Sequence, residues 1–145
     1  PPKEAIDVEI DLPMVAFLPR TYVPDMRVKV DLYRRLARIA NEGELADMAT
    51  ELADRFGPPP EEVRRLLSLA ELRIAAHQSR IRSIHLEDGF AVFGGTGRRH
   101  LETLKEKLAG RLRVVDDHTA YLPLDKGLTT GDRLAEHLKA VLRPN

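Results

Sequence analysis

The hydrophobic and polar positions of this chain are most regular between residues 44 and 57. The apolar residues that share one side of a helix at 100° per residue are Leu45, Met48, Ala49, Leu52 and Phe56. The acidic residues that share the other side are Glu44, Asp47, Glu51 and Asp54. Asn41 is a suitable N-cap with Glu44 in the capping-box position, and Gly57 followed by three prolines ends the run. The pattern predicts an amphipathic helix with an acidic face.

The segments on either side of this helix predict one strand and two further helices. Residues 5–12 alternate apolar and acidic side chains, which is typical of a half-buried strand. Asp25 is a suitable N-cap for a helix from Met26 to about Ala40. The predicted apolar face of that helix comprises Val30, Tyr33, Ala37 and Ala40, widened by Leu36. Pro60 fits the first position of a third helix that continues to about residue 76.

The second half of the chain changes to shorter, β-rich runs. Runs at residues 81–86 and 90–93 flank the turn signal Asp88-Gly89 and predict a hairpin. A helix over about 98–108, strands at 112–116 and 119–124 and a last helix after Thr130 follow. We therefore predict an α+β fold, with an N-terminal strand and three-helix region followed by a ββαββα region. We predict a single domain over residues 1–145, in which the pattern leaves open two subregions, residues 1–80 and 81–145, or one continuous core.

Composition narrows the class of protein. The 145 residues carry 23 basic and 23 acidic side chains, so the net charge is zero, and 43% of residues are hydrophobic. This balance is typical of a soluble globular domain and argues against a nucleic-acid-binding protein with a strongly basic face. The absence of cysteine excludes disulfides, thiolate metal sites and a cysteine nucleophile. No apolar run approaches the ~20 residues of a membrane span, so we expect no membrane partner. Because the chain begins Pro-Pro-Lys-Glu, we expect it to be a piece of a longer polypeptide.

Candidate catalytic chemistry is confined to one glycine-rich turn, Gly94-Gly95-Thr96-Gly97. Backbone N–H groups of such a turn can bind phosphate, but a P-loop needs Gly-Lys-Ser/Thr where this chain has Arg98-Arg99-His100. We therefore interpret the turn as a β–α connection. The five histidines have no second ligand at i+3 or i+4, so no metal site is predicted. We expect no catalytic, cofactor-binding or metal-binding residue, and hence no enzyme activity in this domain.

The acidic side of the predicted helix over residues 44–57 has two interpretations. It is either a solvated helix face, which is the commoner case, or a docking surface for a basic partner. Asp54 favours docking, because the helix dipole disfavours an anion in the last turn. Glu51 has one expected internal partner, Arg55 at i+4. The preceding helix carries five cations, Arg27, Lys29, Arg34, Arg35 and Arg38. We interpret them as a solvated face or as local partners for the nearby acids, and the alternative is that they contact phosphates.

Four stretches of the chain, in this order and spacing, resemble one known family. They are Tyr22-Val23-Pro24-Asp25, Leu32-Tyr33-Arg34-Arg35-Leu36-Ala37, Glu51-Leu52-Ala53-Asp54-Arg55-Phe56-Gly57, and Leu66-Leu67 with Leu72-Arg73. Together they resemble the C-terminal domain of the bacterial transcription-repair coupling factors. The resemblance covers residues 5–84 by specific motifs, and it covers the remainder only by the order of the elements.

The resemblance implies a regulatory domain of a cytoplasmic, ATP-driven DNA translocase that displaces stalled RNA polymerase and recruits UvrA in nucleotide excision repair. In that family the domain lacks a catalytic site, docks on the UvrB-like module of the same polypeptide and masks the surface that UvrA binds. ATP is expected only in the motor domains of the parent protein. The matching motif implies that Glu51 and Asp54 face arginines of that module. The interaction site that we predict comprises Glu44, Asp47, Glu51, Asp54 and Arg55.

Two points stay open at the level of sequence. Pro58-Pro59 stands where the family more often has an apolar pair, which puts the contacts just after Gly57 in question. The leading alternative is a nucleic-acid contact domain of the same translocase. Its contacts would be Arg27, Arg34, Arg35, Arg38 and the Arg98-Arg99 turn. A steep fall of DNA affinity with salt would favour it, whereas the neutral chain and its few aromatic residues argue against it.

Overall fold

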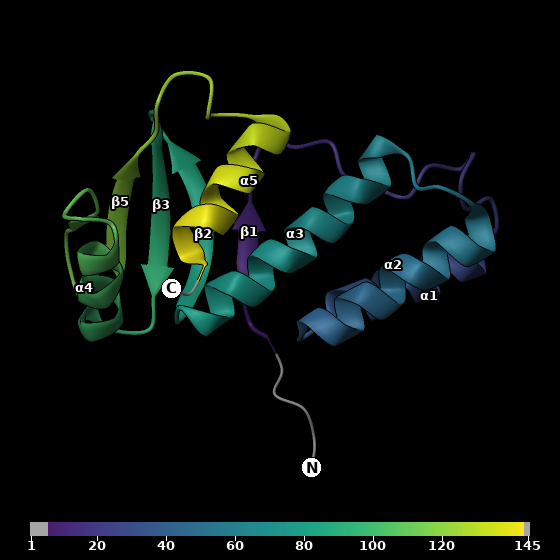
Figure 1. Ribbon diagram of the computed structural model, residues 1–145, viewed down its shortest axis with the longest axis horizontal. Helices are drawn as coiled ribbons and strands as arrows, with labels where there is room; N and C mark the ends of the chain where they lie inside the picture. The colour runs from purple at the N-terminus through teal and green to yellow at the C-terminus, as the bar shows by residue number, and fades with distance from the viewer. Residues whose placement is uncertain (1–5, 144–145) are drawn as a thin grey trace, which may run out of the picture. The chain divides into compact units, whose positions relative to one another are not determined.

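The helices and strands of this protein follow the order that the hydrophobic pattern predicts (Figure 1). The computed structural model describes residues 6–143. Their elements are β1 (Glu9–Asp11), α1 (Met26–Ala37), α2 (Glu42–Phe56), α3 (Glu61–Gln78), β2 (Ile81–Glu87), β3 (Phe90–Gly95), α4 (Arg98–Lys107), β4 (Arg113–Val114), β5 (Thr119–Pro123) and α5 (Gly131–Leu142). The predicted α+β class, with a strand, three helices and then a ββαββα region, is confirmed.

Two compact units divide these elements. The first comprises Ile6 and residues 14–74, which form α1, α2 and most of α3. The second comprises residues 7–13 and the chain from Ala75 onward, which form the sheet, α4, α5 and the last turn of α3. β1 therefore belongs with the sheet, although it precedes α1 in the chain.

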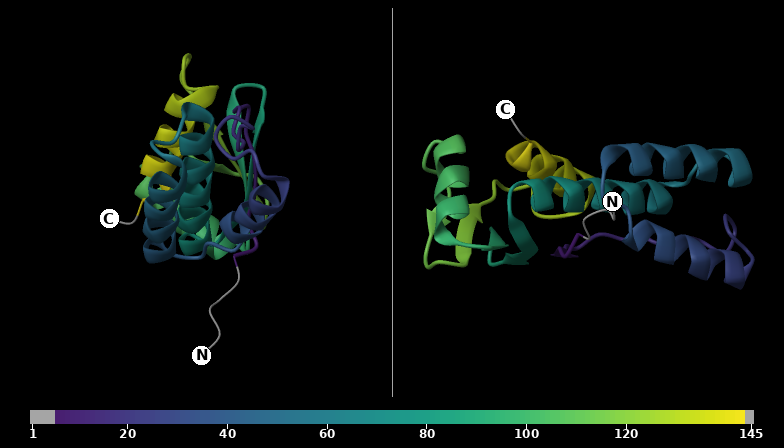
Figure 2. Two further views of the ribbon diagram at one scale, coloured as in Figure 1. Left: turned by 90° about the vertical axis from the view of Figure 1, so that its right-hand side faces the viewer. Right: turned by 90° about the horizontal axis from the view of Figure 1, so that it is seen from below.

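The sheet of the second unit is mixed, with the strand order β1-β2-β3-β5-β4. β1 pairs parallel with β2, and the other neighbours pair antiparallel. The strand predicted over residues 5–12 is shorter in the structure, because only Glu9, Ile10 and Asp11 find partners on β2; Ala5 lies outside the described residues. α5 lies over one face of the sheet in every view (Figure 1, Figure 2), and α4 contacts β3 and β4.

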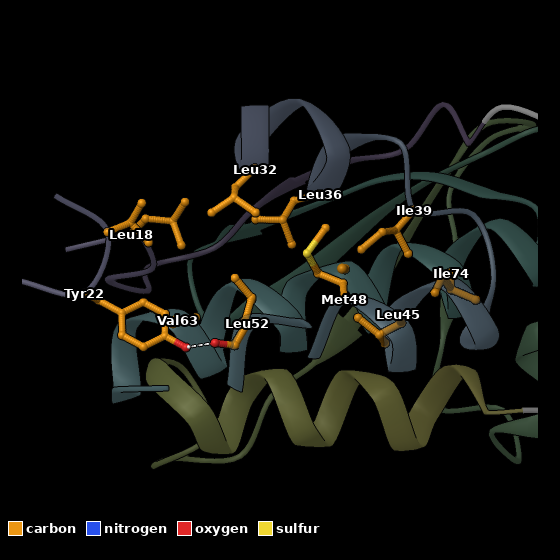
Figure 3. Close-up of a cluster of buried hydrophobic side chains, with 12 residues drawn as sticks. Leu18, Tyr22, Leu32, Leu36, Ile39, Leu45, Met48, Leu52, Val63 and Ile74 are labelled. Carbon is orange, nitrogen blue, oxygen red and sulfur yellow. Dashed lines mark hydrogen bonds between the residues drawn. The ribbon is translucent and has the colours of Figure 1, made fainter. Parts of the chain in front are cut away.

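The apolar side of α2 lies at the centre of the first unit (Figure 3). Leu45, Met48 and Leu52 are buried as the helical spacing predicted, and Ala49 and Phe56 are half-buried. The buried side chains that surround them come from α1, α3 and their flanking segments, and include Leu18, Tyr22, Leu32, Leu36, Ile39, Val63 and Ile74. Burying a large aliphatic side chain contributes about 1.5–3 kcal/mol. These contacts therefore fix which side of α2 faces water.

The predicted apolar face of α1 is wrong except for Leu36. Val30 and Tyr33 are 42% and 38% exposed, whereas Leu32 and Leu36 are buried. The helix carries two apolar stripes, and the core takes the one with the larger aliphatic side chains because these bury more apolar area. Tyr33 lies at the surface instead, where its hydroxyl accepts a hydrogen bond from the backbone N–H of Leu18 at 2.8 Å. α1 also ends before the predicted boundary.

Tyr22 anchors the C-terminal end of α2. Its hydroxyl lies 3.0 Å from the carbonyl oxygen of Leu52 and 2.8 Å from that of Gly57, so it donates a hydrogen bond to the backbone where the helix ends. Its ring packs against Phe56 with the ring centroids 5.5 Å apart. Gly57 has a φ of 89°, a conformation that favours glycine, and its N–H donates to the carbonyl oxygen of Ala53 at 3.0 Å.

We expect Tyr22→Phe to lower the free energy of unfolding by about 0.5–1.5 kcal/mol, because the ring is kept while the carbonyl groups lose their donor. Urea unfolding followed by circular dichroism measures this change. Tyr121→Phe is the matched control, since the Tyr121 hydroxyl makes no hydrogen bond within residues 6–143. The control should stay within about 0.5 kcal/mol of the unmodified chain. Equal losses in the two variants would contradict the anchoring role of Tyr22.

Candidate functional site

The acidic face of α2, which comprises Glu44, Asp47, Glu51 and Asp54, lies opposite the buried stripe of the helix. Asp47 and Asp54 are exposed, whereas Glu44 and Glu51 are half-buried. The four carboxylates are therefore not equivalent. Their partners decide which of them are available to another protein.

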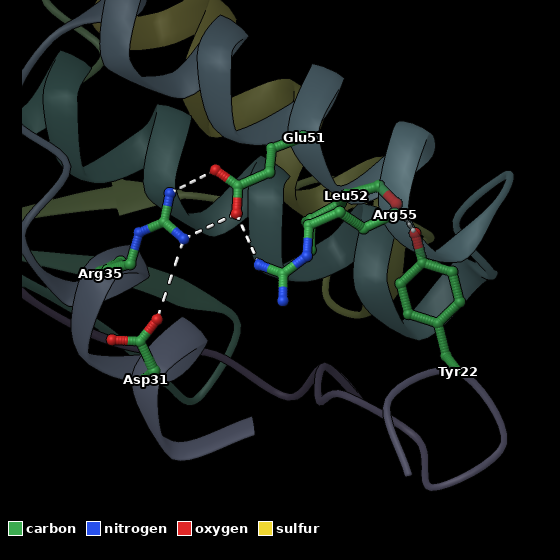
Figure 4. A network of polar contacts seen from close by, with 6 residues as sticks. All are labelled: Tyr22, Asp31, Arg35, Glu51, Leu52 and Arg55. Atoms are coloured by element: carbon green, nitrogen blue, oxygen red, sulfur yellow. Dashed lines mark hydrogen bonds and ion pairs between the residues drawn. The ribbon is translucent and has the colours of Figure 1, made fainter. Parts of the chain in front are cut away.

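Glu51 is held between two arginines (Figure 4). Its Oε1 lies 2.5 Å from Nη2 of Arg35 and its Oε2 lies 2.7 Å from Nη1 of the same guanidinium, a bidentate pair that joins α1 to α2. Oε2 also lies 2.8 Å from Nη1 of Arg55, one turn further along α2. Asp31 adds a longer contact to Arg35, at 3.9 Å. The Glu51 side chain keeps 30% of its surface exposed.

The sequence predicted Arg55 as a partner of Glu51 but did not single out Arg35. Arg35 belongs to the cations of α1, for which pairing with nearby acids was one of the open interpretations, and the structure shows that pairing for this residue. The periodicity of one helix does not give its register against a second helix. The feature of the sequence that indicates such an ion pair is the presence of cations on one helix and acids on the next. It does not identify which residues pair.

The two arginines change the titration of Glu51. Hydrogen bonds from Arg35 and then from Arg55 lower the pKa of the Glu51 carboxyl from 4.5 to about 2. The same hydrogen bond raises the pKa of Arg35. Glu51 is therefore ionised at neutral pH, and both of its oxygens already accept internal hydrogen bonds. The main effect of Glu51 within the domain is to orient the side chains of Arg35 and Arg55.

Glu44 works at the start of α2. Its Oε1 accepts a hydrogen bond from the N–H of Ala40, and its own N–H donates to Oδ1 of Asn41, both at 2.8 Å. Asn41 is thus confirmed as the N-cap, while the reciprocal bond comes from one residue earlier than in the usual capping box. A pocket of about 290 Å³ opens beside it, lined by Arg35, Arg38, Ile39, Glu44, Asp47 and Met48.

Asp47 and Asp54 are the available acids of this face. Within residues 6–143 neither carboxylate has an ion pair or a hydrogen bond. They are seven residues apart, about two helical turns, so they project from one side of α2. Arg55 lies beside Asp54, held by Glu51 and placed over the Phe56 ring at 5.0 Å from its centroid. We name Asp47, Asp54 and Arg55 the docking face.

The other candidates from the sequence are less available. Arg98 pairs with Asp117 at 2.9 Å and with Glu102 at 3.6 Å, and Arg35 pairs with Glu51. Two cations that the nucleic-acid alternative requires are therefore compensated by acids. In the part of the chain that the structure describes, no three histidine, aspartate or glutamate side chains are grouped to hold a metal ion. None of the helices described is long and apolar enough to cross a membrane.

Comparison with known proteins identifies the family of this chain. The profile of the TRCF domain matches residues 12–106, which are 95 of the 145 residues. The chain belongs to the TRCF domain family. The match includes the whole of α1, α2 and α3, so the docking face and the Glu51 bridge lie within it. The resemblance inferred from the four sequence motifs is confirmed.

Relatives of this TRCF domain are named transcription-repair-coupling factors. The protein of Bacillus subtilis (strain 168) is 37% identical over 81 residues, and that of Mycobacterium tuberculosis is 42% identical over 82 residues. These matches cover 56% and 57% of this chain and 7% of each relative, so the chain spans a small part of their length. A solved structure, the C-terminal domain of transcription-repair coupling factor, has the same fold, with a TM-score of 0.75 at 19% identity over 97% of this chain and 90% of that one.

The lowered pKa of Glu51 makes the stability of this TRCF domain depend on pH. The bridge stabilises the fold above the unfolded pKa, and this contribution is lost as the pH falls from 4.5 towards about 2. We expect Glu51→Gln to lower the free energy of unfolding at neutral pH by about 1–2 kcal/mol, a value already reduced for screening by solvent. The difference from the unmodified domain should shrink as the pH falls through that range.

Urea unfolding at a series of pH values measures this dependence. Asp54→Asn is the control, because Asp54 has no partner among residues 6–143 and opposes the helix dipole. It should leave the free energy of unfolding unchanged or raise it by a few tenths of a kcal/mol. A loss in Glu51→Gln that is the same at every pH would show that the ion bridge is not its source.

Proposed function

We propose that this TRCF domain is a non-catalytic docking and regulatory domain of a transcription-repair coupling factor, and that it acts in transcription-coupled DNA repair. The observation that carries the proposal is the docking face, in which two exposed carboxylates without internal partners accompany a guanidinium that Glu51 orients. The proposed partner is the UvrB-like module of the same polypeptide, which would supply the cations. A domain docked there would mask the surface that UvrA binds.

Asp54 gives the strongest support to docking. An anion in the last turn of a helix is disfavoured by about 0.3–1 kcal/mol, and no cation within residues 6–143 offsets that cost. Local rules of this kind are most often broken at functional sites. Arg55 follows directly with the opposite charge. A face that carries charges of both signs fixes the register of a partner, because a shifted partner would bring like charges together.

Glu51 supports docking mainly through Arg55. The family resemblance implied that Glu51 itself faces arginines of the partner module. In this domain it already accepts three hydrogen bonds, from Arg35 and Arg55. An ionised carboxylate offers about four acceptor sites, so room for one further donor is left. We propose that Glu51 holds Arg55 in place and adds at most one direct contact.

Regulation follows from the link between the two modules. A domain tethered to its partner meets it at high effective concentration, so a small polar contact is sufficient to keep it docked. Each 1.4 kcal/mol removed from such a contact changes the docked population about tenfold. The contact can then act as a latch over the UvrA surface. ATP, DNA and RNA polymerase would be engaged by other parts of the parent protein.

The direct test is calorimetric titration of this chain with the separately expressed UvrB-like module. Asp47→Asn combined with Asp54→Asn should weaken binding about 10–100-fold, because the cations of the module would lose their partners. The matched control is Asp11→Asn combined with Asp125→Asn, which removes the same charge from exposed acids of the second unit. The control should change the affinity less than about threefold.

The outcomes separate docking from masking. Equal losses in both double variants would show that net charge alone governs binding, and no binding of the unmodified chain would contradict docking altogether. In the full-length protein, the Asp47 and Asp54 double variant should bind UvrA more tightly than the parent. If the variant docks more weakly but binds UvrA with unchanged affinity, the proposal of masking is contradicted and the proposal of docking still holds.

A further inference from the structure

A pocket of about 210 Å³ in the second unit has no part in the proposed docking. It lies between the turn after α3 and one side of α4, and it is lined by Gln78, Ser79, Arg80, His100, Thr103, Leu104 and Lys107. His100, Thr103 and Lys107 recur at helical spacing, so they project from the same side of α4. The lining contains three basic side chains and no carboxylate.

The glycine-rich turn between β3 and α4 contacts the backbone of Arg80, which lines this pocket. Thr96 donates to the carbonyl oxygen of Arg80 through its backbone N–H at 3.1 Å and its hydroxyl at 3.3 Å. Arg80 has a φ of 60°, which is uncommon for a residue with a side chain and which these hydrogen bonds help to hold. A Cβ on Gly95 would lie 2.8 Å from Leu101, so glycine lets β3 and α4 approach closely.

The positive charge of the pocket is uncompensated. Arg80 and Lys107 have no counter-ion within residues 6–143. Burial lowers the pKa of the Lys107 amine, as expected for a half-buried cation without a neighbouring anion. Among the acids of α4, Glu102 already pairs with Arg98. In a chain whose net charge is zero, this is a local excess of cations.

We propose that this pocket binds a phosphoryl group through Arg80, His100 and Lys107, with the Gln78 amide as a neutral donor. The two cations, a guanidinium and an amine, suit a group with a charge near −2 better than a single carboxylate. Pockets that enclose whole small molecules are usually about 300–1,000 Å³, so this one encloses a phosphate and leaves the rest of its ligand outside. The phosphate belongs either to a nucleic-acid backbone or to a small phosphorylated compound. This inference does not depend on the proposed docking.

The test is an NMR titration of the full chain, labelled with ¹⁵N, at low and constant ionic strength. One arm adds inorganic phosphate, and the other adds a short single-stranded oligothymidylate. We expect saturable shifts at the backbone amides of the residues that line the pocket. Lys107→Gln should weaken binding at least about tenfold. Arg80→Gly should do the same and stay folded, because glycine suits the φ at that position.

Lys105→Gln is the matched control, since Lys105 lies on the same helix but outside the pocket lining. Its binding should stay within about twofold of that of the unmodified chain. Saturation by the oligonucleotide alone assigns the site to backbone phosphates, and saturation by inorganic phosphate assigns it to small phosphorylated compounds. Both outcomes support the proposal. Absence of saturation in both arms, shifts centred elsewhere, or equal losses in Lys105→Gln and Lys107→Gln would overturn it.

Discussion

The burial of Leu45, Met48 and Leu52 is the constraint on which the first unit depends. Each of these side chains contributes about 1.5–3 kcal/mol. The Glu51 ion bridge contributes about 1–2 kcal/mol for the whole network. Core packing therefore sets the rotation of α2 about its axis, and this rotation determines which charged side chains face outward. Tyr22 then fixes the end of the helix, where Asp54 lies.

The carboxylates on the outer side of α2 have two different roles, stabilising the fold and binding a partner. Glu44 completes the N-terminal cap, and Glu51 ties α1 to α2 while it holds Arg55. Asp47 and Asp54 are left without partners among residues 6–143. The continuous acidic stripe of the sequence thus contains two acids that stabilise the fold, Glu44 and Glu51, and two that are available to bind another protein, Asp47 and Asp54. The available pair supports docking better than the stripe as a whole, because internal partners would weaken any contact with a second protein.

The sequence predicted α2 correctly because its apolar and polar residues follow one period and because Asn41 and Gly57 mark its ends. Apart from Leu36, it predicted the wrong face for α1, since that helix carries two apolar stripes and packing against residues distant in the chain selects one of them. The pairing of Arg35 with Glu51 was out of reach for the same reason, as core packing sets the register between helices. The basic pocket of the second unit joins the end of α3 to α4, and no single motif contains both.

The claim that α2 presents a docking face to a basic partner is tested most directly by a chemical-shift map. The ¹⁵N-labelled chain would be titrated with the UvrB-like module, and the shift of each backbone amide recorded. The docking interpretation predicts the largest shifts around Asp47, Asp54 and Arg55, with little change around Val30 on the exposed side of α1. Large shifts on α1 or around the basic pocket, with the amides of α2 unmoved, would contradict it.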